Sequence, residues 1–437
     1  MMHTIDLRGL TPTPAEYSAL IPRALTDVSA ATAIATELIA DVHSRGEAAL
    51  LDQAERLDGI RPPRIRLETA EVSAALSALD PAVRDGLEEA IARVTAASEA
   101  QVPNPTVTTL GPGAEVIQRW SPVQRVGFYV PGGKAVYPSS VVMNVVPALV
   151  AGVGSIALAS PPQKDFGGSV HPTILAAAAL LGIDEVYAMG GAGAIGALAY
   201  GVAGINLNPV QVITGPGNIY VAAAKRLVRG VTGIDAEAGP TEILIIADAT
   251  ADPFLIAVDL ISQAEHDELA AAVLVTDSLS LANAVQAELA RLAPLTPHHE
   301  RAAISLRGQQ SALVLVDNLA QAAHYSNVYG PEHLEIQTEV PEAILPLIDS
   351  AGAIFLGPNS PVSLGDYLAG SNHVLPTGGQ ARFTPGLGAY TFLRPQQVIR
   401  YSKEALKAVE GHIIALATAE NLPAHAAAVT ARFSRVV

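Results

Sequence analysis

The chain has 437 residues, of which 50% are apolar and 16% are charged, so it can bury sizeable cores and gives no sign of disorder. Its formal net charge of −16 argues against binding to nucleic acid or to anionic membranes, because both need basic surfaces. The absence of cysteine excludes disulfides, iron–sulfur clusters, thiolate zinc sites and a thiol nucleophile. Any metal must therefore be bound by His, Asp, Glu or amide groups.

The first hundred residues are predicted to be mainly helical, with apolar positions at helical spacing over 30–45 and 70–97. The Arg-Pro-Pro-Arg sequence at 61–64 interrupts this pattern. An extended hairpin is predicted over 106–120, turning at Gly111-Pro-Gly113.

From residue 123 onwards, short β-rich runs alternate with Ala-rich helices, which is typical of a doubly wound parallel sheet. The predicted strands are 126–130, 155–159, 185–189 and 210–214, and the predicted helices are 139–150, 172–181, 194–201 and one ending at 228. A second set follows, with strands at 242–247, 271–276, 311–316, 334–337 and 352–356 and helices at 253–265 and 279–292. The tail, 400–437, is predicted to be helical with a break at 421–423.

Nothing at the N-terminus, residues 1–20, resembles a secretory signal, so we expect a cytoplasmic protein. Two stretches without charge, 135–163 and 186–224, are long enough to suggest membrane spans. Pro, Gly and Asn residues interrupt both stretches, and strands covered on both faces of a parallel sheet also give continuous apolar sequence. We therefore predict sheet elements there.

Two glycine-rich segments are candidates for nucleotide binding. Gly191-Ala-Gly193-Ala-Ile-Gly196 has the spacing of a dinucleotide-binding turn, but 210–212 lack the acidic residue that should bind ribose. A tight crossing of strand and helix is the simpler interpretation. Gly215-Pro-Gly-Asn218 could offer amides to a phosphate, or Asn218 could cap a helix. Tyr129 stands at a strand end before a rigid turn at 131–133.

Five polar residues are candidates for metal binding or proton transfer. Gln263 and His266 lie three residues apart on a predicted helix and offer oxygen and nitrogen ligands suited to zinc. Glu332 and His333 could supply two proton acceptors at one loop. Asp366 follows a Pro-containing loop, where a carboxylate is normally just solvated. Spacing alone indicates an α/β protein that could bind a nucleotide and a metal, without specifying a reaction.

Seven segments in the expected order resemble histidinol dehydrogenase, and the resemblance extends over nearly the whole chain. They are Arg125-Val-Gly-Phe-Tyr-Val-Pro-Gly-Gly133, Gly215-Pro-Gly-Asn218, Ala238-Gly-Pro-Thr-Glu242, Ser262-Gln-Ala-Glu-His266, Gly330-Pro-Glu-His333, Ser371-Asn-His373 and Ala419-Glu-Asn-Leu-Pro-Ala-His425. The resemblance implies oxidation of L-histidinol through L-histidinaldehyde to L-histidine with two NAD, the last step of histidine biosynthesis.

The resemblance also implies roles for individual residues. The implied ligands of one Zn²⁺ per subunit are Gln263, His266, Asp366 and His425. The implied proton acceptors are Glu332, for hydration of the aldehyde, and His333, for both hydride transfers. The implied substrate contacts are Thr241, Gln263, His266, His333, Asp366, Glu420 and His425. The implied NAD contacts are Tyr129 and Asn218, with a third position, often Gln in the family, that is Gly193 here. The G-x-G-x-x-G pattern therefore arises where relatives lack that glycine, and it is not used as a sign of a standard dinucleotide turn.

The implied fold has two incomplete Rossmann-like, doubly wound α/β domains with helical extensions at both ends, in a homodimer that exchanges its tails. We expect an N-terminal arm (1–25), a discontinuous catalytic domain (26–125 and 238–380), an inserted NAD-binding domain (126–237) and a helical tail (385–437). The tail would carry Glu420 and His425 to the site of the neighbouring subunit.

Three alternatives stay open at this point. One is a paralogous zinc- and NAD-dependent dehydrogenase acting on another alcohol, such as a sulfonated alcohol or a simple polyol, although Glu420 and His425 count against it. Another is a binding protein that has lost catalysis, against which the intact pair of Glu332 and His333 counts. The third is a zinc hydrolase, which would need no NAD.

Overall fold

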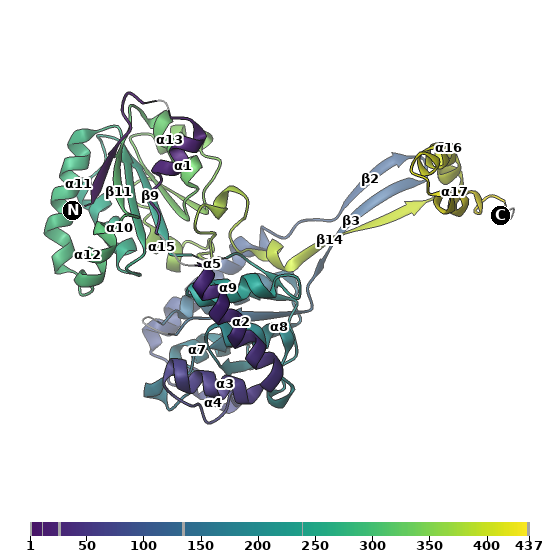
Figure 1. Cartoon of the computed structure of the whole chain (residues 1–437), viewed down its shortest axis with the longest axis horizontal. Helices are drawn as coiled ribbons and strands as arrows, with labels where there is room; N and C mark the ends of the chain where they lie inside the picture. Colours follow the sequence, from purple (N-terminus) through teal and green to yellow (C-terminus); the bar gives the residue numbers. More distant parts are fainter. Residues whose placement is uncertain (1, 11, 25–27, 133–135, 238, 435–437) are drawn as a thin grey trace.

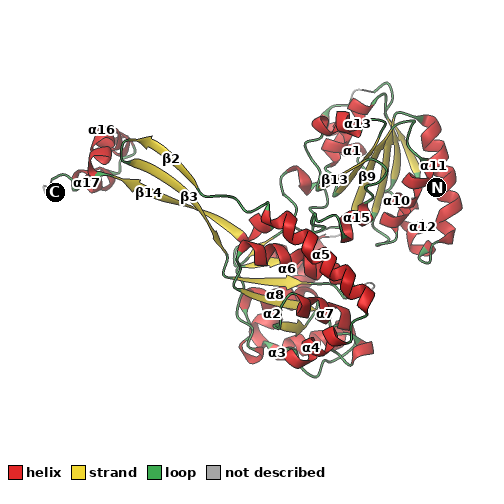
Figure 2. Ribbon diagram, turned by 180° about the vertical axis from the view of Figure 1, so that it is seen from behind, coloured by secondary structure: helices red, strands yellow, loops and turns green. Residues whose placement is uncertain are grey.

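The computed structural model describes residues 2–10, 12–24, 28–132, 136–237 and 239–434, and it contains two α/β units and a long arm (Figure 1). Each unit has a parallel sheet with helices on both faces, and the arm is an antiparallel sheet that ends in helices (Figure 2). The predicted α/β class with parallel sheets is confirmed. Residues 25, 26 and 238, at predicted domain boundaries, and Gly133, in the predicted turn, lie outside the described residues.

The first unit contains a five-stranded sheet in the order β6-β5-β4-β7-β8. Its strands are β4 (Arg125–Tyr129), β5 (Ser155–Ser160), β6 (Val186–Ala188), β7 (Val212–Thr214) and β8 (Gly233–Ile234). The helices that connect them are α6 (Pro138–Ala151), α7 (Pro172–Leu180), α8 (Gly191–Tyr200) and α9 (Ile219–Val228). The strand order reverses between β4 and β7, and doubly wound sheets bind ligands at the carboxyl ends of the strands beside such a switch point.

The charge-free stretches form buried elements of this unit, as predicted. Helix α6 is buried along nearly all of its length, and β5 and α8 are covered on both faces by apolar side chains. Among the described residues, no helix is both long and apolar enough to cross a membrane.

The N-terminal helices pack on the five-stranded unit. They are α2 (Val28–Arg45), α3 (Glu47–Gln53), the π-helix η1 (Ala54–Asp58), α4 (Thr69–Ser77) and α5 (Pro81–Glu99). Helix α2 contacts α8 and α9, α4 contacts α7, and α5 contacts α6. This packing corrects the predicted grouping of 26–125 with 238–380, because the apolar faces of these helices complete the cores around the five-stranded sheet.

The second unit contains a six-stranded parallel sheet. Its strands in sheet order are β1 (His3–Asp6), β11 (Ala312–Leu315), β10 (Ala271–Thr276), β9 (Glu242–Ala247), β12 (His333–Gln337) and β13 (Ala353–Leu356). Its helices are α1 (Pro14–Leu20), α10 (Pro253–Ala264), α11 (Leu279–Leu292), α12 (His299–Arg307), α13 (Leu319–Tyr329), α14 (Pro341–Ile344) and α15 (Val362–Tyr367). Strand β1, which was predicted to belong to a separate arm, pairs with β11 and is part of this sheet.

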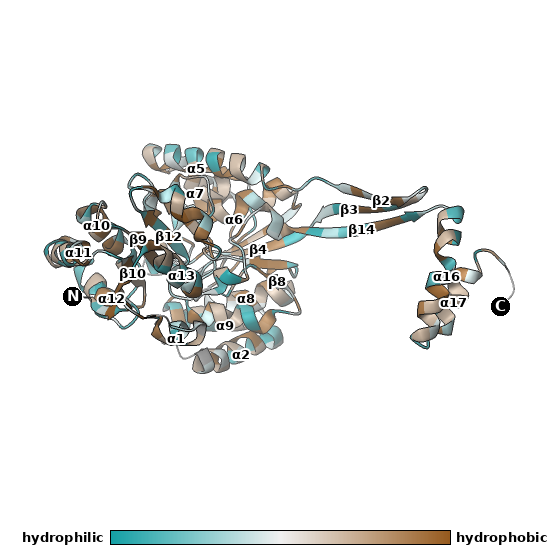
Figure 3. Ribbon diagram, turned by 90° about the horizontal axis from the view of Figure 1, so that it is seen from above, coloured by the Kyte–Doolittle hydropathy of each residue, from teal (hydrophilic) through white to brown (hydrophobic). Residues whose placement is uncertain are grey.

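The arm extends away from both units (Figure 1). It consists of β2 (Thr106–Gly111), β3 (Ala114–Pro122) and β14 (Leu393–Tyr401), with α16 (Lys403–Ala419) and α17 (Pro423–Thr430) at its far end. The predicted hairpin and the predicted break between the two tail helices are confirmed. The prediction that the tail is helical from 385 is wrong for β14, which pairs with β3. Leu110, Ile399 and Leu416 of the arm are exposed. Figure 3 shows hydrophobic stretches, in brown, along the strands of the arm.

Candidate active site

A cavity of ≈ 1520 Å³ is lined by both α/β units. The five-stranded unit contributes residues that follow β4, β5, β6 and β7, such as Pro131 and Asn218. The six-stranded unit contributes residues that stand at the start of its strands, such as Thr241 and Glu332. The carboxyl edge of one parallel sheet therefore faces the amino edge of the other, and the first edge is where doubly wound sheets bind nucleotides.

Glu332 lies directly before β12 and its residue surface is only 7% exposed. Its Oε2 accepts hydrogen bonds from the Thr241 hydroxyl, at 2.5 Å, and from the Glu242 amide, at 2.9 Å. Burial raises the pKa of Glu332 to about 8, against the lowering effect of these two hydrogen bonds. The carboxyl group is therefore fixed in position and holds its proton into slightly alkaline solution.

His333 is the first residue of β12 and is 5% exposed. Its Nδ1 lies 3.0 Å from the carbonyl oxygen of Glu242. Because a carbonyl oxygen can only accept, Nδ1 carries the proton and Nε2 is the acceptor of this ring. Burial lowers the pKa of His333, which keeps the imidazole neutral. The predicted loop is thus a strand end, and it brings the two predicted proton acceptors to the cavity wall together.

Gln263 joins this group through Thr241. The Nε2 of Gln263, in the last turn of α10, donates to the Thr241 hydroxyl at 2.6 Å, and that hydroxyl donates onward to Glu332. With its nitrogen engaged, the amide of Gln263 has its oxygen left to bind a ligand.

His266 and Asp366 line the same cavity. The spacing predicted that His266 lies on the same helix as Gln263. Helix α10 ends at Ala264, however, so His266 lies just beyond it. Asp366 lies in α15 and not at a solvated loop tip. Burial lowers the pKa of His266, and the carboxylate of Asp366 opposes that shift, so the two groups interact electrostatically. Among the described residues, no three His, Asp or Glu side chains form a metal site by themselves.

His373, for which the sequence predicted no role, also lines the cavity, and it lies in one of the segments that resemble the family. Its Nδ1 lies 2.8 Å from the carbonyl oxygen of Asp366, and its Nε2 lies 3.0 Å from the hydroxyl of Ser140 in α6. Nδ1 therefore donates to the carbonyl, and Nε2 accepts from Ser140. The Asn372 amide also donates to Met143 of α6, at 2.6 Å. These bonds connect the loop after α15 to the five-stranded unit.

The turns after β4 and β7 meet at the switch point. A Cβ at position 215 would lie 2.0 Å from the carbonyl oxygen of Tyr129, so only glycine, with φ +122°, allows this contact. The Tyr129 hydroxyl accepts from the Gly191 amide at 3.2 Å, and burial raises the pKa of Tyr129 to about 12. Asn218 caps α9 by accepting from two amides of its first turn, at 3.0 and 3.2 Å. The capping interpretation is confirmed, and Asn218 also lines the cavity.

Gly193 lies inside α8, so the segment from Gly191 to Gly196 is the start of a helix and not a loop. A Cβ at position 193 would lie 2.1 Å from Oε1 of Gln53, and one at position 196 would lie 3.3 Å from the backbone of Ile39 in α2. The close packing is therefore between α8 and the N-terminal helices, and not the predicted crossing of strand and helix. Where α3 and α8 meet, Gln53 lines the cavity and Gly193 does not.

Helices α16 and α17 lie at the far end of the arm, away from both units (Figure 1), and neither Glu420 nor His425 lines the cavity of its own chain. Glu420 follows the last turn of α16, His425 lies in α17, and both are exposed. A single chain therefore brings together Thr241, Gln263, His266, Glu332, His333 and Asp366 but not these two residues.

Comparisons with known proteins identify the family. The family model of histidinol dehydrogenase matches residues 21–433. The histidinol dehydrogenase of Leifsonia xyli subsp. xyli is 68% identical over 99% of each chain, and that of Mycobacterium tuberculosis is 57% identical over 99% of this chain and 98% of the relative. The crystal structure of histidinol dehydrogenase from Elizabethkingia anophelis has a TM-score of 0.91 and 32% identity, over 99% of this chain and 98% of that one. The chain therefore belongs to the histidinol dehydrogenase family of oxidoreductases.

Proposed function

We propose that this enzyme oxidises L-histidinol through L-histidinaldehyde to L-histidine with two NAD, as the last step of histidine biosynthesis. The observation that carries the proposal is the buried pair of Glu332 and His333, which Thr241 and the Glu242 backbone hold at the cavity wall. This pair supplies two proton acceptors, a carboxylate and an imidazole, side by side at the cavity wall.

In the first oxidation, Nε2 of His333 accepts the hydroxyl proton of histidinol while the hydride leaves for the nicotinamide. The chain has no cysteine, so the aldehyde cannot be held as a thiohemiacetal for the second oxidation. Glu332, once ionised, takes a proton from water as the water adds to the aldehyde, and the protonated His333 returns its proton to the aldehyde oxygen. This gives a hydrate whose carbon can donate a hydride, and it leaves His333 neutral again. His333 then accepts the hydroxyl proton of that hydrate.

The residues present fit a zinc ion. The imidazole of His266, the carboxylate of Asp366 and the free amide oxygen of Gln263 are nitrogen and oxygen donors that zinc accepts. We infer that His425 of the partner subunit is the fourth protein ligand. Bound zinc would act as a Lewis acid that positions the imidazole and amine of the substrate.

We also infer a homodimer in which the arm carries Glu420 and His425 into the neighbouring site. The arm supports this because it extends away from the body of its own chain (Figure 3) and bears exposed apolar side chains. An isolated three-stranded sheet also has little core of its own. The net charge of −16 offers no steering for anionic NAD, so the first turns of α8 and α9, which line the cavity, would bind its phosphates.

The test is turnover of L-histidinol with NAD, followed by the NADH absorbance band. We expect two NADH per histidinol, loss of turnover with a chelator and recovery with zinc. No NADH after zinc is restored, or turnover of another alcohol in a panel but not of histidinol, would contradict the proposed substrate. One NADH per histidinol would contradict the second oxidation.

A further inference from the structure

In the five-stranded unit, one wall of the cavity is mainly apolar and carries two polar side chains from the first helices. The apolar wall is formed by the first helices and α9, through Ile34, Leu38, Leu50, Ala54, Leu57, Ala222 and Ala223. The two polar side chains are Gln53 and Asp58, which stand at either end of η1. Neither has a role in the reaction described above.

The π-helix places these two side chains against the same turn of α8. Gln53 and Asp58 are five residues apart, and π-helices bond residue i to residue i+5, so both lie on one side of η1. A Cβ at Gly190 would lie 3.4 Å from Oδ2 of Asp58, and a Cβ at Gly193 would lie 2.1 Å from Oε1 of Gln53. The glycines at these positions therefore admit both oxygens to the first turn of α8.

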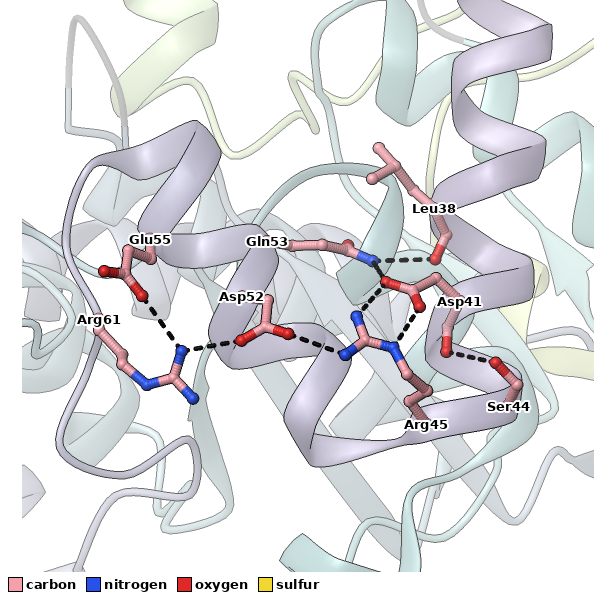
Figure 4. A network of polar contacts seen from close by, with 8 residues as sticks. All are labelled: Leu38, Asp41, Ser44, Arg45, Asp52, Gln53, Glu55 and Arg61. Atoms are coloured by element: carbon pink, nitrogen blue, oxygen red, sulfur yellow. Dashed lines mark hydrogen bonds and ion pairs between the residues drawn. The ribbon is translucent and has the colours of Figure 1, made fainter.

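A network on the outer side of this wall fixes the orientation of Gln53 (Figure 4). Its Nε2 donates to the Leu38 carbonyl at 3.1 Å and to the Asp41 carboxylate at 3.2 Å. Arg45 holds Asp41 in turn with two hydrogen bonds, at 2.6 and 2.8 Å. Because both partners of Nε2 can only accept, the nitrogen is assigned and Oε1 is the atom directed at α8.

Asp58 is partly buried, and in the part of the chain that the structure describes its carboxylate has no hydrogen bond or ion pair. Burial raises the pKa of Asp58 to about 6, so the group is ionised at neutral pH. Lys164 reaches the same wall beside Gly59 but makes no ion pair with Asp58. A partly desolvated carboxylate without donors is costly, and a ligand with hydroxyl groups would satisfy it.

We propose that Asp58 accepts the hydroxyl groups of the adenosine ribose of NAD, beside the acceptor that Gln53 provides, and that it thereby selects NAD over NADP. The inference rests on the proposed use of NAD. Hydride transfer beside His333 places the nicotinamide against the six-stranded unit, so the adenosine lies against the wall formed by η1. In standard Rossmann folds a carboxylate that follows the second strand binds this ribose, whereas here the carboxylate comes from the N-terminal helices.

The experiment is the variant Asp58→Asn, which keeps the shape and removes the charge. NADH binding without histidinol, titrated by fluorescence, should weaken about tenfold or more, as expected for hydrogen bonds to a charged acceptor. In turnover, the KM for NAD should rise while kcat and the KM for histidinol stay constant. The ratio of kcat/KM for NADP to that for NAD should rise by a similar factor.

Two further variants make the test specific. Glu55→Gln removes one negative charge from η1, as Asp58→Asn does. Because Glu55 is exposed and accepts a hydrogen bond from Arg61, the affinity for NADH should not change. Gly193→Ala should weaken NADH binding severalfold, because the added Cβ displaces Oε1 of Gln53. Thermal unfolding of each variant checks that the fold is intact.

The proposal is overturned if Asp58→Asn binds NADH within twofold of the wild-type enzyme, if Glu55→Gln weakens binding equally, or if the NADP-to-NAD ratio does not change. These outcomes are separable from the proposed function. Failure to oxidise histidinol would overturn that function, whereas the NADH titration would still decide the role of Asp58.

Discussion

Burial shifts the pKa values of Glu332 and His333 in opposite directions, because it raises that of the carboxyl group and lowers that of the imidazole. Burial favours the neutral form of both, so the carboxyl group keeps its proton to about pH 8, while the imidazole stays deprotonated below its ordinary pKa. At neutral pH His333 is therefore ready to accept a proton, whereas Glu332 must first lose one. Water activation by Glu332 should consequently govern the pH dependence of aldehyde oxidation.

We expect the rate of aldehyde oxidation to rise with pH and to level off above about 8, because Glu332 is a base only when ionised. Glu332→Gln keeps the acceptor for Thr241 but cannot take a proton, so it should lose about 10²-fold or more in this step together with the rising limb. The measurement is the pH profile of NADH formation with histidinaldehyde as substrate. If the rate of the Glu332→Gln variant rose with pH in the same way, the ionisation of Glu332 could not be the cause of that rise.

His333→Ala should lower kcat for histidinol by about 10²- to 10⁴-fold, because the reaction loses its proton acceptor. Zinc content, measured by elemental analysis, should stay at the wild-type level, since His333 is not among the proposed ligands. His324→Ala is a matched control, because that exposed ring lies on α13 beside Tyr17 and outside the cavity. Loss of zinc together with activity would instead make His333 a ligand.

At the scale of elements, agreement between sequence and structure follows burial. The predicted bounds of β9, β10 and α11 match the structure, because both strands are continuous buried apolar runs and the helix has a clear amphipathic period. Strand β14 was missed because Pro395 and two glutamines interrupt its apolar pattern. Its strand conformation depends on pairing with β3 at the edge of the arm, where proline is tolerated.

The site residues were found through short segments, but the contacts between them depend on distant parts of the chain. Thr241 and Glu332 are 91 residues apart, and Ser140 and His373 are 233 residues apart. Local periodicity carries no information about such pairs. This is why the role of His373 and the free carboxylate of Asp58 emerge only from the fold.

The turn at the switch point depends on a buried ion pair. Lys225 of α9 is 1% exposed, pairs with Asp235 and donates to the carbonyl of Gly215 at 3.0 Å, while Asp235 accepts from the Gly215 amide at 2.9 Å. Lys225→Met leaves the buried carboxylate without its cation, so we expect a loss of about 3–5 kcal/mol in the free energy of unfolding. Urea denaturation measures this loss.

The control for Lys225→Met is Arg84→Ala, which breaks the exposed pair with Glu88 and should cost less than about 1 kcal/mol. If both variants unfolded at the same urea concentration, Lys225 would have no special part in holding the Gly215 turn.

At the scale of the whole molecule, the sequence predicted two α/β units but grouped the first helices with the six-stranded one. An amphipathic helix reveals that one face is covered without identifying the partner, and here α2, α4 and α5 cover the five-stranded unit. The arm is similar, because its apolar residues are exposed in the single chain and would be covered only in the proposed homodimer.

Subunit complementation tests the two-chain site. His333→Ala and His425→Ala should each be inactive, because one lacks the proton acceptor and the other lacks the proposed tail ligand. Refolding an equal mixture should restore about a quarter of wild-type activity, because half of the dimers are mixed and each mixed dimer has one site free of both changes. A mixture as inactive as its components would place both residues in the same chain's site.

The bond between His373 and Ser140 joins the two units at the cavity, and both residues line it. His333 lines the cavity from the six-stranded unit, whereas α2, η1 and α9 line it from the other unit. On the proposed reaction, NADH and NAD would exchange along the wall of α2, η1 and α9 while the aldehyde stays beside His333. The enzyme can thus renew its oxidant between the two steps without releasing a reactive intermediate.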